Sequence, residues 1–174
     1  MSQASKHLEW CLKKAEEEIE ECKKKGLKPK HRGLLKIEPN TEEADKHIKK
    51  AEHNLAVTEY LLKGGFTDTS IGTIFYTMYQ CFLAITSKFG YETANQTCTI
   101  ALIEYLKEER KINLDDRFIK YFKYEEENKE SVIDMREDYT YGTDIKVDKT
   151  KINFFIKECK ELIDNTKEII YKNS

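Results

Sequence analysis

The sequence predicts an all-α protein, built as an up-and-down bundle of long helices. The 174 residues include only two prolines and seven glycines. That is too few for a β-sandwich or barrel, which needs a turn every 8–12 residues. Apolar residues instead recur at three- and four-residue steps along most of the chain, the spacing of a helix face. With 39% hydrophobic and 11% aromatic residues, the chain can fill a core, which excludes a disordered tail.

The first helix is expected over about residues 5–25, because Leu8, Cys11 and Ala15 fall on one face. Gly26 suits the position after the last helical residue. Residues 26–40 contain both prolines and read as a loop. This loop is the only internal boundary, so the chain divides into an N-terminal helix and loop extension, 1–39, and a helical bundle, 40–174.

The second helix begins at Asn40 or Thr41, whose side chains can cap free N–H groups, and ends at the glycine pair 64–65. The third begins between residues 68 and 70 and runs to Phe89. From Ser70 onward it carries no charge before Lys88. A helix that is apolar on nearly every side is surrounded by others or buried in a dimer interface, so we expect a homodimer.

A fourth helix is expected over residues 93–109. A fifth begins at Asp115 or Asp116 and continues to Met135 as one long helix, whose middle, 125–130, is solvated. A loop follows over 138–147, and the last helix begins at Asp148, a good capping residue. No segment predicts a β-strand.

Composition favours a cytoplasmic protein. The chain has no run of 18 apolar residues that could span a membrane, and its first ten residues lack the apolar core of a signal peptide. Its five cysteines are odd in number and widely spaced, which favours reduced thiols, with Cys81 and Cys98 as small core residues. A net charge of −2 gives no global case for nucleic-acid binding.

Most searches for catalytic motifs find nothing. The sequence has no GxGxxG, GxxxxGK[ST], HExxH or GxSxG, and no Glu-x-x-His pair of a di-iron bundle. All four histidines precede residue 54. His7 and Cys11, four residues apart, are at most half of a zinc site. We therefore expect no metal and no cofactor.

The segment 134–142, DMREDYTYG, is less ordinary. It places Arg136, three acids that include Asp138, and two tyrosines, Tyr139 and Tyr141, at the end of a helix. One interpretation is a phosphate-binding arginine beside aromatic rings. The other is a helix terminus fixed by an Arg–Asp pair, with two half-buried tyrosines.

Three stretches resemble a HEPN (higher eukaryote and prokaryote nucleotide-binding) domain of the small, stand-alone archaeal and bacterial type. They are HIKKAEHNLAVTEYLLKGGFTDTSIGTIFYTMYQCFLAI (47–85), YETANQTCTIALIEYL (91–106) and MREDYTYGTDIKVDKTKINFFIKECKELI (135–163). The first resembles the family's opening helix pair with paired aromatics, here Phe75 and Tyr76. The third resembles its "R..DY" segment, here beginning at Arg136.

The resemblance implies a helical bundle that dimerises, often as the toxin half of a toxin–antitoxin pair with a minimal nucleotidyltransferase partner. Many members are metal-independent ribonucleases whose motif is Arg, four to six residues, then His. Arg136 matches that arginine, but Tyr141 and Thr143 occupy the histidine positions. A tyrosine, with an ordinary pKa of about 10, is a poor general base near neutrality, so whether the chain is an enzyme is left open.

Three functions remain. The first is a dimeric, nucleotide- or RNA-associated component of a two-component system, with Arg136, Asp138, Tyr139 and Tyr76 contacting the ligand. The second is a divergent ribonuclease toxin that uses Arg136 with Tyr139 and Tyr141. The third is a purely structural or interaction dimer. In some relatives the partner nucleotidylates a tyrosine near the motif, a role open to Tyr139 or Tyr141.

The extension contributes a local basic cluster. Residues 1–36 hold ten Lys or Arg against six Glu, and the cations gather over residues 23–32. Contact with an RNA backbone is one interpretation. A solvated helix end is the other, since lysine is favoured at helix C-termini.

Overall fold

The computed structural model describes residues 2–124 and 131–172. Across these ranges it confirms the all-α prediction, with seven helices and one two-stranded sheet. The helices are α1 (Gln3–Lys24), α2 (Thr41–Gly64), α3 (Thr67–Lys88), α4 (Gln96–Glu108), α5 (Asp116–Lys120), α6 (Val132–Tyr141) and α7 (Lys149–Tyr171). The strands are β1 (Leu34–Lys36) and β2 (Tyr91–Thr93).

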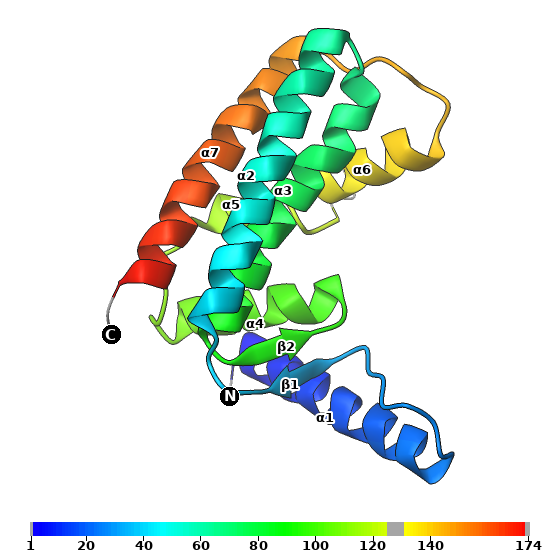
Figure 1. The fold of residues 1–174 in the computed structure, drawn as a ribbon, viewed down its shortest axis with the longest axis vertical. Coiled ribbons are helices and arrows are strands. Elements are labelled where there is room, and N and C mark those ends of the chain that lie inside the picture. The colour runs from blue at the N-terminus through cyan, green and yellow to red at the C-terminus, as the bar shows by residue number, and fades with distance from the viewer. Residues whose placement is uncertain (1, 125–130, 173–174) are drawn as a thin grey trace.

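Helix α3 is the centre of the bundle. It packs against α2, α7, α6 and α4, and α2 runs antiparallel to both α3 and α7 (Figure 1). Its fully buried side chains include Ile71, Ile74, Met78 and Phe82. Burial within one chain therefore explains why α3 carries almost no charge. The homodimer stays a prediction, because the lack of charge on α3 does not by itself require a second chain.

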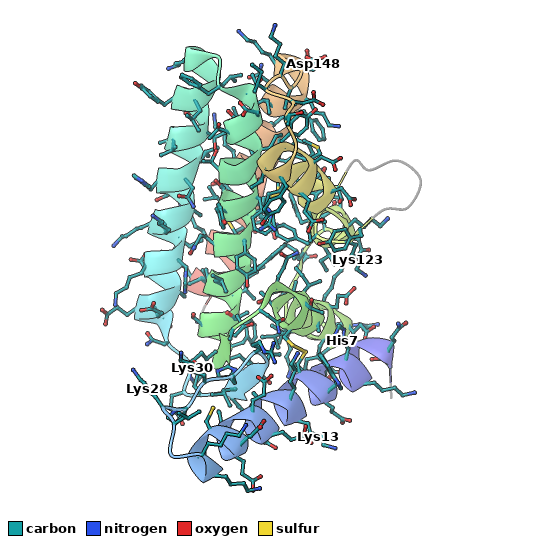
Figure 2. The ribbon with its side chains drawn as sticks, turned by 90° about the vertical axis from the view of Figure 1, so that its right-hand side faces the viewer. His7, Lys13, Lys28, Lys30, Lys123 and Asp148 are labelled. Carbon is teal, nitrogen blue, oxygen red and sulfur yellow. A yellow bond between two sulfur atoms is a disulfide. The ribbon has the colours of Figure 1, made fainter. Side chains whose placement is uncertain are left out.

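Local capping signals set both ends of α2 and the start of α7 as expected, whereas α1 and α3 begin earlier than predicted, at Gln3 and Thr67. The Asn40 side chain accepts a hydrogen bond from the Glu43 amide at 2.9 Å and starts α2. Gly65 ends it with a φ of 83°, a left-handed conformation that glycine adopts without strain. Asp148 caps α7 through the Thr150 amide at 2.7 Å. Figure 2 places Asp148 at the end of the bundle opposite to Lys28 and Lys30.

The expectation of no β-strand is wrong at two places. Leu34–Lys36 pairs antiparallel with Tyr91–Thr93, and this small sheet lies with α1 and α4 across one end of the long bundle (Figure 1). Gly33 makes the approach possible. A Cβ there would lie 2.2 Å from the Cys11 carbonyl oxygen, closer than any side chain allows.

The expectation of reduced cysteines is also wrong in part. Cys11 on α1 and Cys98 on α4 form a disulfide across 87 residues, whereas Cys22, Cys81 and Cys159 are free. Cys81 is a buried core residue as expected, while Cys98 is a cross-link as well. Leu8 and Cys11 belong to the main hydrophobic core, so the boundary at residue 39 does not separate two cores.

The single long fifth helix is wrong as well. The chain forms the short helix α5, then α6, and the two meet where the Ile133 amide donates to the Tyr121 carbonyl at 3.2 Å. The solvated middle expected at 125–130 lies outside the described residues. The loop expected from residue 138 begins only after Tyr141, because α6 continues to that residue. Among the described helices, none is long and apolar enough to cross a membrane.

Candidate functional site

A cleft of about 450 Å³ opens between the first half of α3 and α6. Figure 1 shows α6 beside α3 near the end of the bundle where α3 begins. Helix α3 contributes one wall and α6 the other. The lining residues are Asp68, Thr69, Gly72, Thr73 and Tyr76 from α3, and Arg136, Tyr139, Thr140 and Tyr141 from α6.

Arg136 is held in this cleft by an aromatic ring. Its guanidinium carbon lies 4.3 Å from the ring centroid of Phe75, a cation–π contact. Its Nε is buried and has no hydrogen-bond partner among the described residues. No carboxylate in the described ranges forms an ion pair with the guanidinium. The alternative interpretation, a structural Arg–Asp pair at the helix end, is therefore wrong for this part of the chain.

Phe75 is itself fixed by other rings. It is 2% exposed, it stacks on Tyr79 at 5.9 Å, and it contacts Phe122 at 5.1 Å between ring centroids. Burial raises the pKa of Tyr79 above its usual value, so this aromatic layer stays uncharged. The adjacent Tyr76 packs edge-on against Phe75 at 5.3 Å and is 51% exposed toward the cleft. The paired aromatics thus have different roles, one supporting Arg136 and the other lining the opening.

The acids beside Arg136 in the sequence have other environments in the fold. Glu137 accepts a hydrogen bond from the Tyr124 hydroxyl at 2.6 Å, and that bond raises the pKa of Tyr124. Asp134 accepts a hydrogen bond from the Ser131 hydroxyl at 2.5 Å, at the start of α6. Asp138 is exposed and does not line the cleft. The carboxylate that does line it, Asp68, comes from α3.

The structure therefore brings together Arg136, Tyr139, Tyr141 and Tyr76, and leaves Asp138 outside. The cleft also includes four α3 residues that the sequence did not single out: Asp68, Thr69, Gly72 and Thr73. Counting back from Tyr76 in steps of three or four would have reached this helix face. Nothing in the sequence indicates that α6 packs on it.

The structure also bears on the half zinc site and on the basic N-terminal cluster. Cys11 is bound to Cys98, so the half zinc site with His7 is wrong. Among the described residues, no group of three His, Cys, Asp or Glu side chains could hold a metal ion.

Half of the lysines and arginines in the basic N-terminal cluster are paired with acids. Arg32 pairs with Glu18 at 3.1 Å, and Lys24 pairs with Glu20 at 2.9 Å. Lys25 also pairs with Glu21 at 2.5 Å. These pairs favour the interpretation of a solvated helix end.

Comparison with protein-family models finds no match, and comparison with curated proteins finds none either. The HEPN resemblance therefore rests on the three sequence stretches alone.

Proposed function

We propose that this chain is a HEPN-like, nucleotide- or RNA-associated component of a two-component, toxin–antitoxin-like system with a nucleotidyltransferase partner. One observation carries the proposal. Arg136, the residue that matches the family's arginine, lines one cleft with Tyr76, Tyr139 and Tyr141. Its guanidinium is held over Phe75 rather than neutralised by a described carboxylate.

The cleft offers the chemistry that a nucleotide needs. A guanidinium binds phosphate through paired, charge-assisted hydrogen bonds. Exposed tyrosine rings provide faces on which a base stacks, and Tyr76 and Tyr141 are 51% and 78% exposed. The volume of about 450 Å³ lies in the range of small-molecule sites. Asp68, on the opposite wall, can accept a hydrogen bond from a ribose hydroxyl or a base amino group.

The divergent ribonuclease remains the second candidate, favoured by the same juxtaposition. Arg136 would stabilise charge on the scissile phosphate, while Tyr139 and Tyr141 are within the same cleft. A histidine, the usual group for moving the 2′-hydroxyl proton, is not among the lining residues. Catalysis would then depend on Tyr139 or Tyr141, on Asp68, or on a residue of a dimer mate.

Nucleotide binding by an Arg136→Ala variant tests the main proposal. Calorimetric titration with ATP and with AMP should show a dissociation constant roughly 10- to 100-fold higher for the variant. That factor corresponds to the free energy that hydrogen bonds to a charged group usually contribute. Lys50→Ala removes one positive charge from an exposed position on α2 and should bind like the unaltered protein. Equal affinities of the Arg136 variant and the unaltered protein would refute the site.

The same proteins, incubated with RNA in EDTA, test the ribonuclease. Cleavage that disappears in Arg136→Ala supports it, whereas equal background cleavage contradicts it. Incubation with the cognate nucleotidyltransferase and ATP tests the modification of Tyr139 or Tyr141. A gain of one nucleotidyl group in the intact mass, lost in the variant Tyr139→Phe/Tyr141→Phe, is the expected result. Light scattering tests the proposed homodimer, and a monomeric mass contradicts it.

A further inference from the structure

A second, larger cleft of about 980 Å³ lies at the other end of the bundle. It forms where α2 begins and where α3, α4 and α7 end; in Figure 1 these ends lie together, away from α6. Five basic side chains line it, against one carboxylate, Glu168. The basic residues are Lys88, Lys107, Arg110, Lys111 and Lys172.

Among residues 2–124 and 131–172, Lys107 alone of these five cations forms an ion pair, with Asp116. Lys111 packs its ammonium over the Tyr105 ring at 5.4 Å. In the N-terminal cluster, by contrast, Lys24, Lys25 and Arg32 are each paired with a glutamate of α1. The whole chain has a net charge of −2, so its composition does not explain a cleft lined by five cations and one acid.

Lysines at the C-terminal ends of helices interact favourably with the helix dipole, and this accounts for Lys88 and Lys107 individually. It does not account for the backbone conformation of Arg110. This residue has a φ of 55°, the left-handed conformation in which glycine is the usual residue after a helix. An arginine at this position accepts backbone strain, and the resulting turn places Arg110 and Lys111 together on the cleft wall.

We propose that this basic cleft binds the phosphodiester backbone of single-stranded RNA. Its cations come from the ends of three helices and from the turn after α4, so they match a series of phosphates better than one small anion. Its apolar lining residues Phe89, Ile112 and Ile169 are buried or half-buried, and the half-buried Phe89 and Ile169 can pack against bases. Binding in a membrane interface uses exposed apolar side chains, and none of these three is exposed. The inference does not rest on the Arg136 site.

Charge-neutralised variants test the inference. Lys88→Gln, Lys111→Gln and Lys172→Gln together remove three cleft charges. Lys50→Gln, Lys63→Gln and Lys157→Gln remove three exposed helical charges elsewhere and give the same net charge. A labelled 20-nucleotide RNA, followed by fluorescence anisotropy from 50 to 200 mM salt, reports affinity. The cleft variant should bind roughly 100-fold more weakly near 0.1 M salt, with a salt slope about 2 units smaller, as expected for three lost phosphate contacts on a single strand.

Equal weakening by the two triple variants would overturn the inference, since it would indicate general attraction to the chain's charge. So would failure of the unaltered protein to bind RNA, or binding only to vesicles that contain anionic lipid. Loss of RNA binding in Arg136→Ala, with the cleft triple variant unaffected, would overturn this inference and leave the proposed nucleotide site intact. Loss of mononucleotide binding in Arg136→Ala, with RNA binding lost in the cleft variant alone, supports both sites separately.

Lysine acetylation of the unaltered protein gives a test that does not depend on the variants folding. Saturating RNA should protect Lys88, Lys111 and Lys172 from acetylation by at least about threefold, a loss of exposure expected when phosphates occupy their ammonium groups. Lys50, Lys63 and Lys157 should react as before. Uniform protection, or none, would overturn the inference.

Discussion

The Cys11–Cys98 disulfide makes the sharpest prediction about stability. It closes a loop of 87 residues, from the first helix to α4. Cross-linking a loop of that length removes about 4.6 kcal/mol of loop-closure entropy from the unfolded chain at 25 °C in the chain-entropy model. Loss of native disulfides costs about 2–5 kcal/mol in practice. For a chain of this size, that corresponds to a fall in melting temperature of roughly 5–20 °C.

The measurement is a thermal melt of four samples. They are the unaltered protein, the same protein with a phosphine reductant, the double variant Cys11→Ala/Cys98→Ala, and Cys22→Ala. We expect the reduced protein and the double variant to melt at similarly lowered temperatures, because each has lost the cross-link. Cys22 is a free cysteine, so its variant controls for losing a thiol and should melt near the unaltered protein.

Thiol counting provides the direct check. Alkylation under denaturing, non-reducing conditions should modify three cysteines, namely Cys22, Cys81 and Cys159. Modification of all five, with no effect of reductant on the melting temperature, would refute the cross-link. The result also bears on compartment. Disulfides are rare in a reducing cytosol, and the expectation of a cytoplasmic protein relied partly on reduced thiols, so alkylation of intact cells before lysis would test that expectation.

Three further predictions concern the cleft, the alkaline limit of stability and the small sheet. At Gly72 an added Cβ meets no heavy atom within 4 Å, so the leucine of Gly72→Leu should extend into the Arg136 cleft. ATP binding should weaken at least about tenfold, while the free energy of unfolding should stay level or rise by up to about 1 kcal/mol, because leucine favours a helix more than glycine. Gly72→Ala is the control, and unchanged affinity in Gly72→Leu would contradict the site. Burial raises the pKa of the Cys81 thiol to about 12, from an ordinary 9.0. The stability that the buried neutral thiol contributes is therefore complete below pH 9 and is lost as the pH rises toward 12, by up to about 4 kcal/mol. Between pH 8 and pH 11, the free energy of unfolding in urea should fall less in Cys81→Ala than in Cys22→Ala. Equal falls in the two variants would contradict this reasoning. Gly33→Ala should lower the free energy of unfolding, measured in urea, by about 1–3 kcal/mol, because its methyl group would clash with the Cys11 carbonyl. An unchanged free energy would show that β1 approaches α1 less closely.

The features that the sequence predicted well are those with local causes. The start of α2 follows from the Asn40 side chain and its end from the left-handed Gly65, both within one helical turn of the groups they satisfy. The composition of α3 correctly indicated a helix enclosed by others. What encloses it could not be read from the chain, because α7 packs on α3 although Cys159 on α7 and Ile74 on α3, which are in contact, are 85 residues apart.

The larger errors depend on pairing between segments that are separated in the sequence. The strands β1 and β2 are three residues each and are separated by 54 residues, so neither carries a periodic pattern that marks a strand. The disulfide joins two cysteines whose pairing no spacing rule determines. The apolar positions from Phe118 to Met135 fit one long helix, and only the tertiary bond from Ile133 to the Tyr121 carbonyl shows that the chain turns back there.

The candidate site also combines features with local causes, which the sequence predicted, and features that depend on distant segments, which it did not. Arg136, Tyr139 and Tyr141 were found together because they lie within six residues of one another, in the C-terminal half of α6. Their apparent acidic environment was misleading, since Glu137 is bonded to Tyr124 and Asp138 lies away from the cleft. The acid that does face the ligand space, Asp68, is separated from Arg136 by 68 residues. Its position depends on how α6 packs on α3.

Net charge is a poor guide to the partners of this protein, because its cations differ in how far nearby acids neutralise them. The N-terminal cluster is the most basic stretch of the sequence, yet Lys24, Lys25 and Arg32 in it lie beside glutamates of α1. The cleft at the ends of α3, α4 and α7 has no comparable run of cations in the sequence, yet it collects five of them around one acid. Affinity for a polyanion depends on cations that can exchange counterions for phosphates, and a lysine already paired with a glutamate gains less from that exchange. The triple variant of the cleft should therefore weaken RNA binding more than neutralisation of Lys24, Lys25 and Arg32, although the latter set is the more conspicuous in the sequence.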